Sequence, residues 1–308
     1  MIGRVIAFQN PAHLSLKLGQ LVVHLLDIDK LQNVSDDFKQ QHVKTLPIED
    51  IAVVVLDNKQ ITITSSVMTA LLENNVAIVI CNDQHMPVGL QLPLDGHNLQ
   101  SERFRQQIDA SEPLKKQMWQ QTISAKINGQ ATVLREDGIE IGNMLAWARQ
   151  VRSGDLDNLE GRAAVYYWRS VFHNPNFIRG QEEAPPNNLL NYGYAIVRAL
   201  MARALVSAGL LPTLGIHHHN RYNAYCLADD IMEPYRPCVD RVVKELINKI
   251  ADFSTLTPAI KQELLFIPFM DVMLDGHKTP LMNAVQLTAN SVQKCFSGES
   301  RKILYPDW

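Results

Sequence analysis

Cysteine is scarce in this sequence: its 308 residues include 4 cysteines, and no two of them form a C-x-x-C pair. Disulfide frameworks and structural zinc knuckles need cysteines at short, repeated spacings, so we expect neither. No apolar run reaches the roughly 18 residues that a membrane-spanning helix requires. Gln9, Asn10 and Pro11 stand where a signal peptide would be apolar. These absences predict a cytoplasmic protein with reduced thiols that does not bind a membrane.

A strong positive charge is also missing, because the net charge is −3 at pH 7. This value argues against a generally basic surface for nucleic acid. The charge is uneven, however: residues 1–100 contain 6 Lys and Arg against 10 Asp and Glu, whereas residues 149–249 contain 12 against 10. Ten of those twelve cations are arginines, which bind phosphate in a bidentate geometry. A solvated helical face explains the same enrichment.

The hydrophobic pattern changes along the chain, and 308 residues are enough for two domains. Up to about residue 95, short β-branched runs are separated by Asn, Asp, Pro and Gly, as is typical of strands and turns. These runs cover residues 4–8, 20–28, 51–56, 60–64, 76–81 and 88–92. One helix, 65–75, interrupts them, with Ser65 or Ser66 as its N-cap. The polar segment 93–100 marks the domain boundary.

After residue 100, apolar residues recur every three or four positions, which predicts helices. The expected helical segments cover residues 111–134, 139–151, 157–172, 187–209, 238–253, 257–274 and 279–296. Asn187 stands where an N-cap is expected, and Gly209 where a C-cap is. The sequence therefore predicts an α+β protein, with a β domain over residues 1–95 and a larger all-α domain over residues 96–308.

Ionisable side chains are concentrated in "LGIHHHNRYNAYCLADDIMEPYRP", residues 214–237, which contains three histidines, three carboxylates and two arginines. Turn-forming residues place the histidines in a loop, followed by a short helix that ends at Pro234. Asp229 and Asp230 precede Glu233 by four and three residues, so they can share its helix face. Carboxylates together with an imidazole suit Mg²⁺ or Mn²⁺. A solvent-exposed loop explains the same composition, and the segment alone leaves both interpretations open.

A metal that activates a phosphodiester usually has further acidic ligands, and Glu160 is the candidate elsewhere in the chain. Its segment also fits a helix start, because Asp157 and Glu160 have the spacing of a capping box. Ala163 and Ala164 share the helix face of Glu160 and leave room for a close neighbour. The spacing therefore allows both roles, cap and ligand.

Three stretches together resemble the CRISPR-associated integrase family, the metal-dependent subunit that inserts new spacers into a CRISPR array. They are "LEGRAAVYYWRSVF" at 159–172, the segment 190–237 with "GIHHH" and "LADDIMEP", and the paired runs "PIEDIAVVVLD" and "VAIVICNDQHMPVG" within 47–89. The likeness extends from about Pro47 to Asp240 and is closest to members from type II systems.

This resemblance implies a fold, a site and partners. It implies that the N-terminal domain is a β-sandwich that forms homodimers and that the helical domain has one site for Mg²⁺ or Mn²⁺. Matched by motif, the catalytic residues and metal ligands are Glu160, His218 and Glu233. Asp230 matches an additional acid that some members use. The implied partners are double-stranded DNA and a second small CRISPR-associated adaptation protein, which joins the dimer in a heterohexameric complex.

Four other residues are auxiliary candidates. Arg162, Arg221 and Arg236 flank the expected ligands and could hold phosphates, with a solvated surface role as the alternative. Tyr192 is a candidate contact to DNA, although the apolar stripe of its helix also explains an aromatic residue there.

The reaction that the resemblance implies is transesterification, in which the 3′-hydroxyl of a short DNA fragment attacks a phosphodiester at the edge of a repeat. Two functions of other classes also fit the sequence. One is a metal-dependent nuclease that uses water, and strand joining from a supplied 3′ end would distinguish it. The other is a DNA-binding scaffold with an inactive site, which the absence of Mn²⁺ binding would support.

Overall fold

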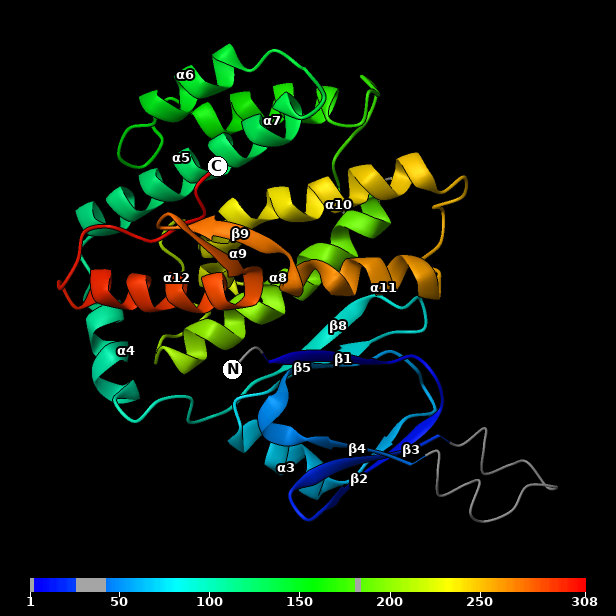
Figure 1. Cartoon of the computed structure of the whole chain (residues 1–308). Helices are drawn as coiled ribbons and strands as arrows, with labels where there is room; N and C mark the ends of the chain where they lie inside the picture. The colour runs from blue at the N-terminus through cyan, green and yellow to red at the C-terminus, as the bar shows by residue number, and fades with distance from the viewer. Residues whose placement is uncertain (1–2, 26–42, 181–183) are drawn as a thin grey trace. The chain divides into compact units, whose positions relative to one another are not determined.

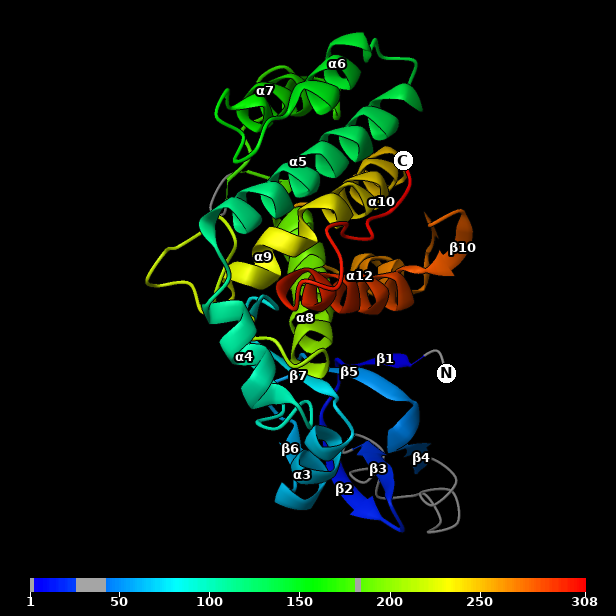
Figure 2. The ribbon, with the colours of Figure 1, turned by 90° about the vertical axis from the view of Figure 1, so that its left-hand side faces the viewer.

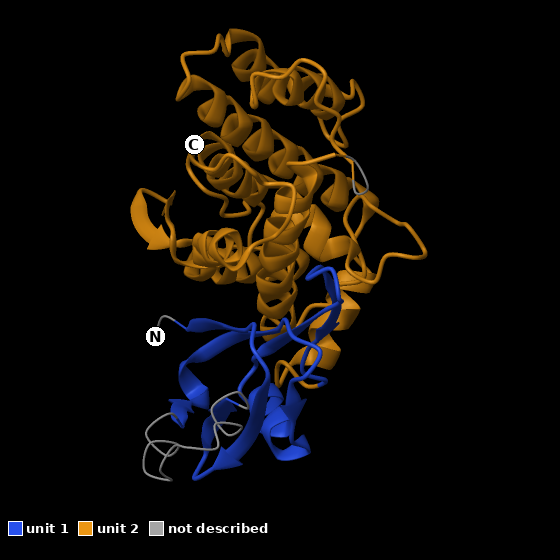
Figure 3. Cartoon of the chain, turned by 90° about the vertical axis from the view of Figure 1, so that its right-hand side faces the viewer, with its two compact units in different colours: residues 1–94 blue, residues 95–308 orange. Residues whose placement is uncertain are grey.

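The computed structural model describes residues 3–25, 43–180 and 184–308. The chain divides into two compact units, Met1–Leu94 and Asp95–Trp308 (Figure 3). Strands dominate the first unit and helices the second, so the chain has the α+β composition that the hydrophobic pattern predicts. The end of the predicted strand 20–28 lies outside the described residues beyond residue 25.

Two four-stranded sheets make up most of the described first unit (Figure 1). Their strands are β1 (Arg4–Phe8), β2 (Ala12–Lys17), β3 (Gln20–Leu25), β4 (Lys44–Pro47), β5 (Ile51–Leu56), β6 (Thr62–Ile63), β7 (Ala77–Cys81) and β8 (Pro87–Gln91). One sheet has the order β1-β5-β7-β8, with β1 and β7 parallel to β5 and β8 antiparallel to β7. The other has the order β4-β3-β2-β6.

One hydrophobic core connects both sheets with helix α3 (Ser65–Glu73). Val54 and Ile78 enter it from the first sheet, and Leu14 and Leu21 from the second. β5 is a central strand that is buried along almost its whole length, which explains why its sequence is a continuous β-branched run.

The sequence pattern misses two strands and misplaces one cap in this unit. β2 and β4 have no β-branched run, yet apolar and polar residues alternate along β2 and bury one of its faces. The predicted N-cap at Ser65 or Ser66 is wrong, because Thr64 occupies that position with extended backbone dihedrals. The Thr64 hydroxyl lies 3.1 Å from that of Ser66 and bonds no helical N–H group.

The second unit consists mainly of helices (Figures 1 and 2). They are α4 (Gln100–Ile108), α5 (Glu112–Arg135), α6 (Gly142–Gln150), α7 (Leu159–Ser170), α8 (Asn187–Ser207), α9 (Cys226–Met232), α10 (Arg236–Lys249), α11 (Pro258–Phe266) and α12 (Leu281–Phe296), with 3₁₀ turns η2 (Glu233–Tyr235) and η3 (Ile267–Phe269). The long α5 contacts α6, α7 and α10, whereas α8 contacts α9, α10, α11 and α12. The candidate site lies where α5, α7 and α9 meet.

The all-α prediction for residues 96–308 is wrong, because β9 (Asp271–Leu274) and β10 (His277–Pro280) form an antiparallel hairpin. The helix predicted over 257–274 therefore ends early, at Phe266. Asp275 (φ 51°) and Gly276 (φ 75°) both have the left-handed backbone that a two-residue hairpin turn favours.

α8 is the buried central helix of this unit. By length and composition it could cross a membrane, which corrects the expectation that no segment qualifies, but 78% of its apolar window is buried, as in the core helix of a folded domain. Pro186 rather than Asn187 is the N-cap of α8. The Asn187 side chain instead accepts from the N–H of Gly180 and donates to the carbonyl of Ala184, so it fixes the preceding loop.

Candidate functional site

Glu160 lies in the first turn of α7, where other side chains satisfy the free N–H groups. Asn158 is the N-cap, with a left-handed backbone (φ 50°, ψ 48°), and its side chain accepts from the Gly161 N–H at 3.2 Å. Asp155 accepts from the N–H groups of Leu159 at 2.9 Å and Glu160 at 3.0 Å. The Glu160 carboxylate is therefore not needed to cap its own helix.

The structure rules out the capping box, which was one of the two roles that the spacing allows for Glu160. Asp157 pairs with Arg152 through an ion pair of 2.7 Å and does not cap the helix. The Glu160 carboxylate instead meets Lys126 of α5, whose Nζ donates to Oε1 at 2.6 Å. The alternative in which Glu160 serves its own helix end is thus removed, and its carboxylate faces a neighbouring helix.

Glu233 stands directly after α9, and its side chain is 8% exposed. Its Oε1 accepts from Nε of Arg236 at 2.8 Å. Its Oε2 lies 2.6 Å from Nζ of Lys126, the same ammonium that binds Glu160. Burial alone would raise the pKa of Glu233, but Arg236 and Lys126 together lower that pKa to about 2. Glu233 is therefore an ionised, buried carboxylate whose oxygens each face a cation: Oε1 faces the Arg236 guanidinium and Oε2 faces the Lys126 ammonium.

Lys126 lies between the two carboxylates. Burial by itself would lower the pKa of the Lys126 ammonium, but Glu233 and Glu160 outweigh burial and raise it above its usual value. No local motif marks this lysine in the sequence. Trp119 and Lys126 are seven residues apart and share one face of α5, but this spacing does not indicate a role at the site.

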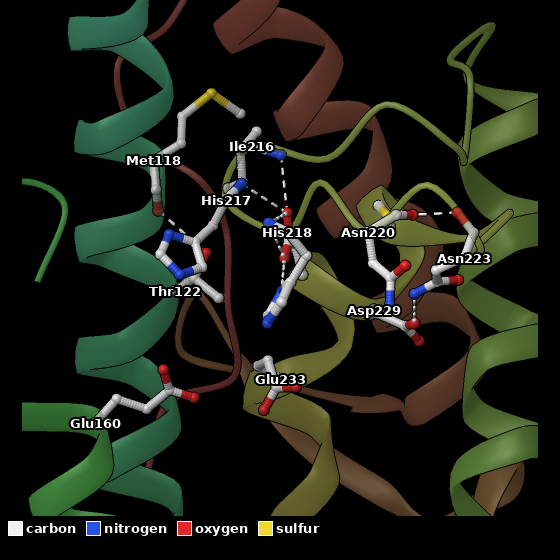
Figure 4. A network of polar contacts seen from close by, with 12 residues as sticks. Met118, Thr122, Glu160, Ile216, His217, His218, Asn220, Asn223, Asp229 and Glu233 are labelled. Atoms are coloured by element: carbon white, nitrogen blue, oxygen red, sulfur yellow. Dashed lines mark hydrogen bonds and ion pairs between the residues drawn. The ribbon is translucent and has the colours of Figure 1, made fainter. Parts of the chain in front are cut away.

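Asp230 lies in α9 and holds the loop that contains the three histidines, residues 217–219. This fully buried carboxylate accepts from the N–H groups of Ile216 at 2.8 Å and His217 at 2.9 Å, and it also bonds Nδ1 of His218. That hydrogen bond raises the pKa of His218, although burial opposes it. With Nδ1 bonded to a carboxylate, the Nε2 lone pair of a neutral ring is free for a ligand. In Figure 4 this nitrogen points toward the space between Glu160 and Glu233.

The three histidines have different environments. His217 stacks on Trp119, with ring centroids 4.1 Å apart and planes inclined by 2°, and burial lowers its pKa. The Trp119 ring also meets the edge of the His218 ring, with centroids 5.6 Å apart. All three histidines are exposed. Gly215 permits the tight loop, because a Cβ there would lie 2.4 Å from the His218 carbonyl oxygen. His218 is thus the histidine that faces Glu160 and Glu233.

The four auxiliary candidates differ in exposure and in their partners. Arg162 and Arg221 are exposed. Arg236 is bound to Glu233, and its guanidinium lies 4.6 Å from the centroid of the Tyr194 ring. Tyr192 is fully buried in α8, which favours its alternative role as a core aromatic.

Two other carboxylates near these residues have their own partners. Asp229 is held by Arg198, with Nε at 2.6 Å, and by Asn223 at 2.7 Å. The buried Asp240 accepts from the hydroxyls of Tyr167 and Tyr194, and burial raises its pKa to about 6. Asp240 therefore holds Tyr194, whose ring contacts the Arg236 guanidinium. No local sequence pattern indicates this contact.

The predicted ligands face one another but do not form a closed metal site. Within the described ranges, no three His, Cys, Asp or Glu side chains are grouped closely enough to hold a metal. The chemistry of the donors nevertheless fits Mg²⁺ or Mn²⁺: they are the Glu160 carboxylate, Oε2 of Glu233 and Nε2 of His218.

A pocket of about 390 Å³ adjoins His218. Lys115, His219 and Arg221 contribute basic side chains to its wall, and Asn220 contributes an amide. Basic side chains beside a carboxylate site suit a ligand that carries several negative charges, such as a nucleic acid strand.

Comparison with known proteins gives one consistent result. The family described as CRISPR associated protein Cas1 matches residues 8–255. The chain is 34% identical to the CRISPR-associated endonuclease Cas1 of Neisseria meningitidis serogroup C over 306 residues, which cover 99% of this chain and 95% of the relative. A casposase bound to its integration product is similar in structure, with a TM-score of 0.77 and 20% identity over 97% of this chain and 92% of the casposase.

A second solved structure, titled Cas6-RT-Cas1–Cas2 complex, matches with a TM-score of 0.72 and 19% identity. The match covers 98% of this chain and 36% of the longer one. The family match extends from the last residue of β1 to beyond the end of α10, and the Neisseria relative aligns with almost the whole chain. The chain therefore belongs to the Cas1 family of CRISPR-associated proteins.

Proposed function

We propose that this chain is a metal-dependent DNA endonuclease and integrase that inserts short DNA fragments into a CRISPR repeat during spacer acquisition. Its full-length similarity to a relative named as a CRISPR-associated endonuclease supports this activity. The observation that carries the proposal is the pair of carboxylates, Glu160 and Glu233, opposite the free nitrogen of His218.

The proposed metal ligands are Glu160, His218 and Glu233, and the metal is Mg²⁺ or Mn²⁺. When bound, such an ion lowers the pKa of an attacking hydroxyl and stabilises charge on the phosphate. Asp230 is a positioning residue in this scheme, because it acts through His218. The buried carboxylate of Glu233 and the contact between Nδ1 of His218 and Asp230, which leaves Nε2 on the other side of the ring, support the assignment.

The proposed reaction conserves phosphodiester bonds. The 3′-hydroxyl oxygen of the incoming DNA forms a bond to a repeat phosphorus, and the bond from that phosphorus to the repeat's own 3′ oxygen breaks. The proton lost by the attacking hydroxyl is balanced by one gained at the departing 3′ oxygen. The chain's part is to hold both DNA ends in line and to keep water from the phosphorus.

Basic side chains around the ligands would hold the DNA backbone. Arg221 and Lys115 line the pocket beside His218, and Arg162 is exposed two residues after Glu160. Arg236 donates to Glu233 and its guanidinium lies against the Tyr194 ring, so we assign it to ligand positioning rather than to phosphate. Binding through phosphates releases counterions, so DNA affinity should fall steeply with salt.

Integration of a labelled duplex into a supercoiled plasmid tests the function. Purified protein with Mn²⁺ should join the 3′ ends of the duplex to plasmid DNA, and EDTA should abolish joining. A duplex with 3′-dideoxy ends is the matched control, because it lacks only the attacking hydroxyl. Cleavage of the plasmid without joining would contradict the integrase and leave a hydrolytic nuclease, while the absence of both would contradict an active site.

The assembly that we propose is a homodimer that binds DNA together with a small adaptation protein in a heterohexamer. We propose that the first unit is a face-to-face β-sandwich that forms the dimer contact. Its edge strand β8 and the exposed apolar side chains Ile80 and Val88 favour pairing with a second copy. The structural relative in a Cas1–Cas2 complex supports the small partner.

Sedimentation tests the dimer. At micromolar concentration the chain should sediment with twice the mass of one copy, and Val88→Lys should shift it toward monomer because a charge would be buried in the contact. Lys59→Glu, a change in the same unit on an exposed side chain, is the control. A wild-type chain that sediments as a monomer would exclude the dimer.

A further inference from the structure

Lys126 occupies the space between the two carboxylates. Its Nζ lies 2.6 Å from Oε1 of Glu160 and 2.6 Å from Oε2 of Glu233. The Lys126 side chain is 12% exposed, so few waters compete for its ammonium. The two acids belong to different elements, the start of α7 and the end of α9, and α5 supplies the cation between them.

Two ionised carboxylates at this distance from a common point repel each other unless a cation lies between them. A divalent ion bound to both would stand about 2.0–2.3 Å from the oxygens, nearer than the ammonium does. The ion and the ammonium would then share one small space with the same sign of charge. They cannot both hold these two oxygens.

We propose that Lys126 is an internal counter-cation for this site: its ammonium holds Glu160 and Glu233 together in the metal-free protein and leaves at least one of them when the metal binds. This proposal rests on the metal site proposed above. The flexible stem of lysine allows the ammonium to move while α5 stays in place. Lys126 is accordingly a positioning residue that lowers metal affinity and keeps the two ligands aligned until metal arrives.

Loss of Lys126 should change the Mn²⁺ affinity in one direction if this lysine competes with the metal, and in the opposite direction if it only supports the ligands. A lysine that remains in place and orients the ligands for the metal would strengthen metal binding, so its loss would weaken it. A lysine that competes with the metal weakens binding, so its loss should tighten it. The direction of the change in Mn²⁺ affinity separates the two.

Isothermal titration of the full chain with Mn²⁺ measures that direction. Lys126→Met removes the charge and keeps an unbranched side chain, whereas Lys126→Arg keeps the charge. Lys244→Met is the matched control, because Lys244 is 8% exposed and pairs with Asp137 at 3.0 Å and Glu136 at 3.7 Å, two carboxylates outside the proposed ligand set. Melting temperatures with EDTA and with saturating Mn²⁺ provide the second readout.

We expect Lys126→Met to bind Mn²⁺ roughly tenfold more tightly or better, because a like charge within a few ångströms of the ion is gone. Its melting temperature should lie below that of wild type in EDTA and recover with Mn²⁺. Lys126→Arg should keep an affinity near that of wild type, and Lys244→Met should lose melting temperature without a change in affinity.

Unchanged or weaker Mn²⁺ binding by Lys126→Met, with wild type binding normally, overturns the counter-cation and leaves the metal site intact. If neither wild type nor Lys126→Met binds Mn²⁺, the metal site itself is wrong and this inference ends with it. If Lys126→Met binds Mn²⁺ and wild type does not, the result supports competition between the Lys126 ammonium and the metal.

Discussion

Glu233→Gln should reduce strand transfer by about 100-fold or more, the effect expected when one preorganised charged group is lost from an active site. The amide keeps the volume of the side chain, and its oxygen can still accept from Arg236. It cannot supply the negative charge that would hold a divalent ion next to Glu160. Gel-based integration with Mn²⁺, together with calorimetric Mn²⁺ titration, measures both losses.

The same substitution leaves Lys126 with one carboxylate instead of two. Because Glu233 is 8% exposed, we expect the free energy of unfolding to fall by about 3 kcal/mol, the cost of breaking a buried ion pair. Affinity for DNA should persist, since the exposed basic residues are unchanged. Glu136→Gln is the control: Glu136 pairs with Arg241 at 2.7 Å, outside the proposed ligand set, and should keep strand transfer. Normal strand transfer by Glu233→Gln would show that Glu233 is not a metal ligand.

The candidate site shows what local sequence can and cannot predict. His218 and Glu233 lie within one short segment, so loop and helix signals are enough to place them near each other. Glu160 is different, because its spacing fits a helix cap equally well and only the resemblance to a family favours a ligand. The structure separates the two roles through Asn158 and Asp155, which satisfy the helix end.

Lys126 could not be predicted from spacing. It lies far from both acids along the chain, and the three meet only because α5, α7 and the end of α9 pack together. A buried lysine in an amphipathic helix looks like any surface lysine until its neighbours are known. The residue that holds the two acids together therefore depends on tertiary packing, which local patterns do not contain.

The fold shows the same division. The order of strands before helices follows from the change in hydrophobic period, which is a property of long segments. The sequence pattern does not show the hairpin of β9 and β10, because β9 continues an apolar run that also fits a helix and β10 is a polar four-residue segment with one β-branched residue, Thr279. The Asp275-Gly276 pair was the local signal that could have identified it, since this dipeptide favours tight hairpin turns.

Asp230→Asn should weaken Mn²⁺ binding by about 10- to 100-fold, the usual cost of losing the carboxylate that orients a histidine ligand. Asp230 accepts from Nδ1 of His218 and from the N–H groups of Ile216 and His217, so it fixes both the ring and the loop. An amide offers a single acceptor oxygen and no charge for these donors. The ring of His218 should then turn, and its Nε2 should no longer face Glu160.

Asp229→Asn is the matched control for this prediction. Asp229 is the adjacent residue, equally part of α9 and 7% exposed, but its carboxylate serves Arg198 and Asn223 instead of the histidine loop. Both variants remove one buried charge from the same helix turn, so both should melt at lower temperature than wild type. Only Asp230→Asn should lose Mn²⁺ affinity and strand transfer. Equal losses of Mn²⁺ affinity in both variants would mean that the affinity depends on the total negative charge of α9. The proposed role of Asp230 in orienting His218 would then be wrong.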